Sequence, residues 1–164
     1  MKLTTKGRYA VSAMADIAAF SVNSAIAQEP GEQCPVTLSD VSLRQGISLS
    51  YLEQLFNKLR KAELVSSQRG VRGGYLLNRP AGEIRISEIV DAVDEGIHTT
   101  ACAPGSSKGC QGTSARCLTH DLWDELGRQI GIFLNTVTLE DVLAKRVLGM
   151  ASVNAPVRPE EGVA

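Results

Sequence analysis

The chain has 164 residues, of which 43% are hydrophobic, and a formal net charge of −1. This length suits one compact core with an appendage better than two full domains. No segment has the order of a signal peptide, and no apolar run approaches the roughly 18 residues that cross a bilayer. The composition therefore argues against a secreted or membrane-spanning protein, and it predicts a cytoplasmic one without a membrane partner.

Charge is distributed unevenly along the sequence. Residues 1–80 contain ten Lys and Arg against six Asp and Glu, a balance of +4, whereas residues 81–164 contain seven against twelve, a balance of −5. Between Arg44 and Arg79 there are seven basic residues and two acidic ones. A local excess of this kind favours contact with a phosphate backbone, and a solvated surface without a partner is the alternative.

The first part of the chain predicts three helices, because apolar residues recur there at helical spacing. They are expected at Lys6–Phe20, Thr37–Gln45 and Leu49–Ala62. Thr37 and Asp40 have the spacing of a capping box, and Gly46 ends the second helix. Two short strands, Leu64–Gln68 and Tyr75–Asn78, should follow as a hairpin with a glycine-rich tip that carries two arginines. A short helix around Ser87–Val93 closes this module.

The second part of the chain divides into three segments. Residues 96–116 contain four Gly, three Ser, three Thr and two Cys but almost no large apolar residue, so burial alone cannot fold them. Leu118–Val137 predicts a long amphipathic helix, which we expect to pair with a second copy of the chain; packing within one chain is the alternative. Thr138 is expected to cap a last helix.

These patterns predict a mainly α fold with a small β-wing. The expected units are a winged helix-turn-helix domain at residues 1–95, a metal-binding loop at 96–117, a dimerisation helix with a C-terminal helix at 118–149, and a disordered tail at 150–164. Helix, tight turn, helix and basic hairpin follow one another in this motif, whose third helix enters the major groove of double-stranded DNA.

The third helix carries polar side chains opposite its leucine stripe. The candidates for DNA contact there are Ser50, Tyr51, Glu53, Gln54, Lys58 and Lys61. Gln54 has the amide that can read adenine, whereas the two lysines suit phosphate. Ser50 and Glu53 also fit a capping box, a purely structural role that remains open.

Further basic candidates lie outside the third helix. Arg69 and Arg72 stand among glycines at the expected wing tip, where insertion into a minor groove and a solvated turn are both open. Lys6 and Arg8 lie at the start of the first helix, where backbone amides favour an anion such as phosphate.

Three thiols and one imidazole lie in a span of nineteen residues, which begins in the polar segment and ends just after it. They belong to Cys102, Cys110, Cys117 and His120, with seven, six and two residues between them. These gaps do not match the short Cys-x-x-Cys knuckles of common zinc sites. The chemistry alone leaves zinc, an iron-sulfur cluster and reactive thiols open.

Four segments carry a family resemblance: LTTKGRYAVSAM, QGISLSYLEQLFNKLRKAELVSSQRG, GGYLL and CLTHDLW. Over residues 1 to about 147 the chain resembles the IscR family of winged-helix, cluster-binding transcriptional regulators. The resemblance implies a homodimer that holds a 2Fe-2S cluster on the three cysteines and His120, receives it from the iron-sulfur assembly machinery, and represses or activates assembly genes. It also places DNA recognition at Ser50, Tyr51, Glu53, Gln54 and Arg69.

The chain departs from the family pattern in three ways: a longer loop at 23–35, wider cysteine gaps, and Val71-Arg72 where Pro-Gly is usual. Cys34 matches no family ligand and is interpreted as a loop thiol. The alternatives are a related regulator that senses nitric oxide or iron, a zinc-stabilised constitutive DNA-binding protein, and a thiol redox enzyme using Cys34 or Cys102. The enzyme hypothesis lacks a Cys-x-x-Cys pair and a nucleophile-base pattern, so we expect no enzymatic activity.

Overall fold

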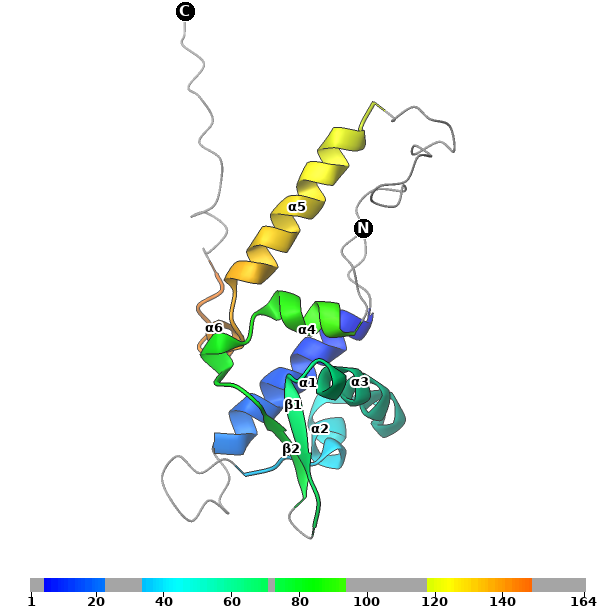
Figure 1. Cartoon of the computed structure of the whole chain (residues 1–164), viewed down its shortest axis with the longest axis vertical. Helices are drawn as coiled ribbons and strands as arrows, with labels where there is room; N and C mark the ends of the chain where they lie inside the picture. Colours follow the sequence, from blue (N-terminus) through cyan, green and yellow to red (C-terminus); the bar gives the residue numbers. More distant parts are fainter. Residues whose placement is uncertain (1–4, 23–33, 71–72, 94–117, 149–164) are drawn as a thin grey trace, which may run out of the picture.

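The computed structural model describes residues 5–22, 34–70, 73–93 and 118–148 (Figure 1). Their elements, in chain order, are α1 (Thr5–Val22), α2 (Leu38–Gln45), α3 (Leu49–Lys61), β1 (Val65–Gln68), β2 (Gly74–Leu77), the 3-10 helix η1 (Ala81–Glu83), α4 (Ile86–Ala92), α5 (His120–Thr136) and α6 (Leu139–Leu143). The predicted fold class, mainly α with a small β-wing, is confirmed. None of the described helices combines the length and the apolar character needed to cross a membrane.

The boundaries of α2 follow from its end residues. Thr37 Oγ1 accepts the backbone N–H of Asp40 at 3.1 Å and donates to the Asp40 carboxylate at 2.8 Å. Gly46 ends the helix with φ of +66°, in the left-handed region that glycine enters without a steric penalty. The cap at Thr37 and the end at Gly46 are as predicted, but the Asp40 carboxylate accepts from the Thr37 hydroxyl, whereas in the predicted capping box it would accept from a backbone N–H.

The wing is an antiparallel pair of strands with a third segment beside it. Val65 pairs with Leu77 and Gln68 with Gly74 across β1 and β2. On the other side of β2, Val36 N–H donates to Tyr75 O at 3.0 Å, and Tyr75 N–H donates to Val36 O at 2.8 Å. The segment before α2 thus extends the sheet by one bridge, which the sequence patterns did not predict.

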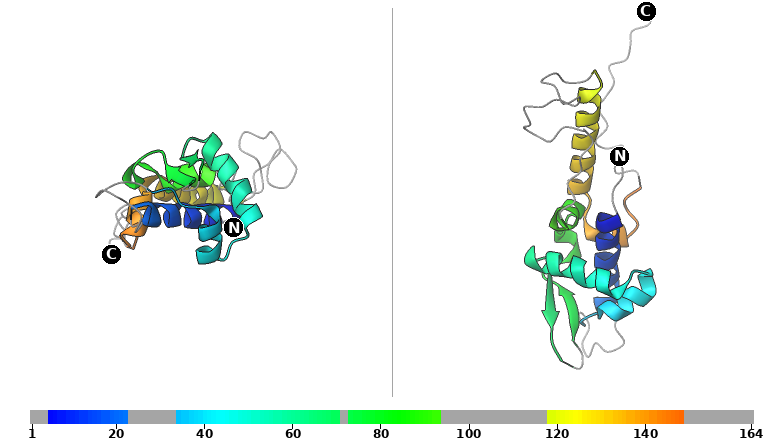
Figure 2. Two further views of the ribbon diagram at one scale, coloured as in Figure 1. Left: turned by 90° about the horizontal axis from the view of Figure 1, so that it is seen from below. Right: turned by 90° about the vertical axis from the view of Figure 1, so that its right-hand side faces the viewer.

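The core lies around α1. Met14 and Ile17 of α1 are fully buried, as are Phe56 of α3 and Ile89 of α4. Leu139 of α6 also has no exposed surface, so the chain after α5 returns to the core of the winged module. Figures 1 and 2 show α5 rising away from this body, with its C-terminal end at α4 and α6.

Candidate nucleic-acid interface and metal site

The two faces of α3 differ in burial as the sequence predicts. The apolar stripe that packs on the core consists of Leu52, Leu55, Phe56 and Leu59. The opposite face exposes Ser50, Glu53, Gln54, Asn57 and Lys61. Because the stripe fixes the rotation of the helix about its axis, these polar side chains point away from the body, as a recognition helix requires.

The start of α3 corrects one expectation. The residue that precedes the helix is Ser48, and Ser50 already lies within the first turn. A capping box formed by Ser50 and Glu53 would need Ser50 at the position of Ser48, so that interpretation is wrong. The exposed side chains of Ser50 and Glu53 consequently serve no such cap.

Tyr51 and Lys58 differ from the other candidates because they are half-buried. The Tyr51 ring packs edge-on against Tyr9 of α1, with ring centroids 5.9 Å apart and an interplanar angle of 85°. Lys58 lies in the last turn of α3 with Arg60 and Lys61, where cations also interact favourably with the helix dipole. These three basic side chains therefore stabilise the end of α3 whether or not they also contact DNA.

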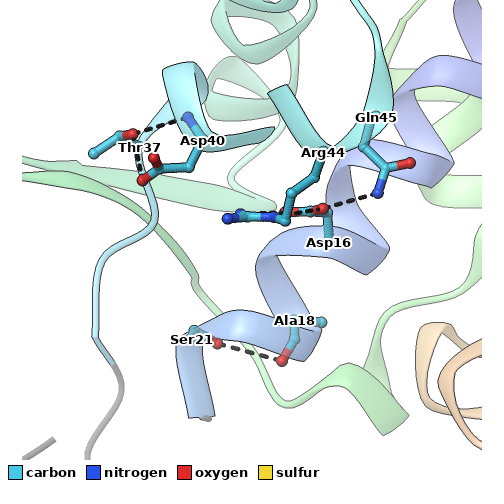
Figure 3. Close-up of polar contacts among 7 residues, drawn as sticks. All are labelled: Asp16, Ala18, Ser21, Thr37, Asp40, Arg44 and Gln45. Atoms are coloured by element: carbon cyan, nitrogen blue, oxygen red, sulfur yellow. Dashed lines mark hydrogen bonds and ion pairs between the residues drawn. The ribbon is translucent and has the colours of Figure 1, made fainter. Parts of the chain in front are cut away.

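The end of α2 is clamped to α1 by a buried carboxylate (Figure 3). The Asp16 side chain has no exposed surface. It accepts hydrogen bonds from Arg44 Nη2 at 2.6 Å and Nε at 3.1 Å, and from Gln45 Nε2 at 2.8 Å. The hydrogen bonds that Arg44 donates to Asp16 raise the pKa of Arg44, whose guanidinium also lies 4.1 Å from the centre of the Phe20 ring.

This clamp helps to position α3, because it holds the last turn of α2 directly before the turn into α3. Ser42 Oγ donates to Ile47 O at 2.6 Å and braces that turn from within. The sequence analysis missed Asp16. Its signal was an acidic residue within the apolar face of the first helix, since a buried charge needs a partner.

The remaining basic candidates are only partly described. Arg69 is exposed directly after β1, and Lys6 and Arg8 are exposed in the first turn of α1. Arg72 lies outside the described residues. The structure therefore places Arg69 at the end of β1. That Arg69 and Arg72 both lie at the tip of the wing stays a prediction.

Of the four predicted metal ligands, only His120 is described. It is the first residue of α5 and is 9% exposed. Cys102, Cys110 and Cys117 lie outside the described residues, and within the described ranges no three His, Cys, Asp or Glu side chains gather as a metal site would need. Thiolates with one imidazole suit both zinc and an iron-sulfur centre, so the donor set itself fits a cluster.

The apolar stripe of α5 has two parts. Phe133 and Leu134 pack on the core of the same chain. Nearer the start of the helix, Leu122 and Trp123 are 62% and 43% exposed. Packing within one chain thus accounts for the C-terminal part of the stripe, and the N-terminal part presents its apolar surface outward.

Comparison with known proteins agrees with this geometry. A model of the Rrf2 family, an iron-dependent transcriptional regulator, matches residues 3–145. The HTH-type transcriptional regulator IscR of Xenorhabdus nematophila is 52% identical over 143 residues, which cover 87% of this chain and 79% of that protein. The protein of the same name from Klebsiella pneumoniae is also 52% identical over 143 residues, covering 87% and 80%.

Solved structures share the fold. The T. potens IscR structure superposes with a TM-score of 0.66 at 32% identity, covering 89% of this chain and 88% of that one. CymR, the global cysteine regulator of B. subtilis, gives a TM-score of 0.68 at 26% identity, covering 88% and 98%. Both comparisons extend over nearly the whole chain, from the winged module through α5.

Proposed function

Since the chain belongs to the Rrf2 family of iron-dependent transcriptional regulators, we propose that it binds operator DNA, carries a 2Fe-2S cluster, and controls iron-sulfur assembly genes according to cluster occupancy. Its DNA-binding elements would be α3 and the wing. It would act in the cytoplasm as a homodimer and receive its cluster from the iron-sulfur assembly machinery. Catalysis has no part in this function.

The exposed polar face of α3 is the observation that carries the DNA-binding proposal. Gln54 and Lys61 stand on it, opposite a fully packed stripe. The Asp16–Arg44 clamp joins the end of α2 to α1 before any DNA is bound, which would lower the cost of ordering these helices on binding. Arg69 adds a cation at the end of β1, from which a neighbouring groove is within reach of a docked wing.

The cluster proposal is supported by the donor types and by the place of His120. Cys102, Cys110 and Cys117 would supply three thiolates and His120 one imidazole. A neutral imidazole leaves the ligand set less negative than four thiolates would, which generally raises the reduction potential of the bound cluster. His120 is the first residue of α5, so a cluster bound to its imidazole would be attached directly to the helix that leads back to the core.

The homodimer proposal rests on the outward apolar surface of α5. Leu122 and Trp123 lie one after the other near the start of the helix and remain exposed in one chain. Burying such a surface against its own copy gives a two-fold dimer, and dimeric regulators read two half-sites about one helical turn apart. A Leu122→Glu variant should sediment as a monomer while keeping the helical content of the wild type.

One experiment tests the cluster and the DNA partner together. The wild type and His120→Ala are purified anaerobically, and ultraviolet-visible spectra, iron and acid-labile sulfide are measured. Each protein then selects duplexes from a random-sequence DNA pool. We expect a brown wild type with about two irons and two sulfides per chain, an altered spectrum in the variant, and selection of a defined sequence.

Two controls sharpen this experiment. Cys34→Ser should retain the cluster, because Cys34 matches none of the proposed ligands. Cys110→Ala should lose it and select a different set of duplexes, since cluster occupancy is proposed to change the DNA preference. A colourless zinc protein with unchanged selection would defeat the cluster proposal and leave a constitutive DNA-binding protein.

A further inference from the structure

The segment after β2 ties the wing to the start of α4. Arg79 donates from Nη2 to Glu88 Oε1 at 2.9 Å and from Nη1 to the backbone oxygen of Glu83 at 3.4 Å. The other carboxylate oxygen of Glu88 accepts the backbone N–H of Arg85 at 2.8 Å. Glu88 therefore binds Arg79, which follows β2, through Oε1, and Arg85, which precedes α4, through Oε2.

The beginning of α4 in turn holds the end of α5. Arg85 Nη1 donates to Thr136 O at 2.9 Å, and Ile86 N–H donates to Val137 O at 3.0 Å. Arg85 also forms an antiparallel bridge with Thr138. Because backbone bonds fix this junction, the base of α5 cannot shift without moving the residues that carry Glu88.

Glu88 is held in this place as a carboxylate. Burial by itself would raise its pKa, but the hydrogen bonds from Arg85 and Arg79 outweigh burial and keep the pKa below the usual range. The Arg79 and Glu88 side chains are 39% and 38% exposed, so the pair adds little to stability in solvent. Its two-sided geometry is better suited to fixing the position of the wing.

We propose that Glu88 is a positioning residue that holds the wing in a fixed relation to the base of α5, so that Arg69 and α3 engage the same DNA together. The inference rests on the proposed DNA-binding function. It also provides a route from α5 to the wing, since a movement at Thr136 would reach Arg79 through Arg85 and Glu88.

A double-mutant cycle with Arg69 tests this coupling. Glu88→Gln keeps an amide oxygen for the Arg85 N–H but removes the charge that pairs with Arg79. Affinity is measured for the duplex that the wild type selects from the random pool, in backgrounds with Arg69 and with Arg69→Ala. We expect Glu88→Gln to weaken binding about fivefold with Arg69 present and less than about twofold without it.

The matched control is Glu140→Gln. Glu140 lies in α6 and forms an exposed ion pair in which its Oε1 is 3.6 Å from Arg146 Nη2. Its substitution changes the net charge by the same amount and should alter binding equally little in both backgrounds. Arg79→Met provides a second test from the other side of the contact and should give the same coupling with Arg69 as Glu88→Gln. Denaturant midpoints of every variant verify folding.

The outcomes separate the inference from the proposed function. Equal losses from Glu88→Gln in both Arg69 backgrounds would show that Glu88 acts independently of the wing, which overturns the inference. A wild-type affinity that Arg69→Ala leaves unchanged would also overturn it, because the wing would then make no contact to position. Failure of the wild type to select any duplex would instead refute the proposed DNA-binding function itself.

Discussion

Arg44 and Asp16 lie 28 residues apart in the sequence, and their side chains meet with Nη2 2.6 Å from Oδ1. The carboxylate is fully buried, whereas the guanidinium side chain remains 31% exposed and covers the Phe20 ring. The Asp16 carboxylate is therefore removed from solvent, whereas the Arg44 side chain is still in contact with solvent. The pair joins α1 to α2, the helix that precedes α3.

Replacing Arg44 by Met should destabilise the protein strongly, because among the described residues it leaves the buried Asp16 carboxylate with Gln45 as its one hydrogen-bonding side chain. Breaking a buried ion pair from one side costs about 3–5 kcal/mol, and the partial exposure of Arg44 favours the lower end. Urea denaturation measures the loss. The control is Arg128→Met, which removes the exposed Arg128–Glu125 pair and should leave the midpoint unchanged. Equal effects from both substitutions would contradict the clamp.

Gly74→Ala should loosen the wing. A Cβ there would lie 2.6 Å from Val36 O, a backbone atom that cannot move aside without breaking the Val36–Tyr75 bridge. Steric overpacking of this kind costs about 1–3 kcal/mol. Hydrogen exchange at the Tyr75 amide should report the opening. By contrast, Gly131→Ala meets no neighbour in the described chain and should stabilise α5, since alanine favours helix.

Gln54→Ala and Lys61→Ala should affect DNA binding in different ways. If Gln54 reads a base edge, its loss costs about 1–3 kcal/mol of discrimination at one position of the selected duplex. Lys61→Ala should instead weaken all duplexes alike and reduce the slope of log affinity against log salt by about one unit. Binding isotherms at several salt concentrations distinguish the two roles. A uniform loss for Gln54→Ala would argue against base reading.

Glu53→Ala should widen the range of sequences that the protein accepts. The Glu53 side chain is exposed on the polar face of α3, and if that face contacts DNA, its carboxylate would repel phosphate and disfavour some bases. Its removal should strengthen binding to duplexes that the wild type disfavours. Selection from the random pool by both proteins provides the measurement. Since Glu53 forms no capping box, a general loss of binding with retained stability would contradict this selectivity role.

Asp141 should make stability dependent on pH in the acid range. The Thr138 hydroxyl and backbone N–H donate to Asp141 at 2.6 and 3.1 Å and lower its pKa. The unfolded chain therefore takes up this proton first on acidification, near the ordinary value of about 3.9. The stabilisation is complete above that value and is lost as the pH falls through the folded-state pKa.

Asp141→Asn removes this dependence. Denaturation at a series of pH values should show the wild type losing more stability than the variant as the pH is lowered from about 6 to about 2. The difference in unfolding free energy between the two proteins should therefore shrink toward acid pH. A difference that stays constant over the whole range would contradict the role given to the Thr138–Asp141 contact.

Local features of the fold were predictable because neighbouring residues determine them. Thr37 and Gly46 bound α2 as expected, and Thr138 caps α6, since a cap depends on atoms within one turn of chain. The polar face of α3 was predictable for the same reason. At the start of α3 the expected first residue, Leu49, was right, whereas the capping box that the Ser50–Glu53 spacing also allowed does not form, because Ser48 is the residue that precedes the helix.

The sequence by itself determined the type of fold, the exposed polar face of α3 and the set of residues proposed as cluster ligands, since periodicity and residue chemistry suffice for these. Only the tertiary structure decided which distant groups meet: Asp16 with Arg44, Val36 with Tyr75, and Arg85 with the end of α5. Such contacts depend on how helices pack around one core. An acidic residue on an apolar helix face indicates that a partner is needed, but only the folded structure shows that the partner of Asp16 is Arg44.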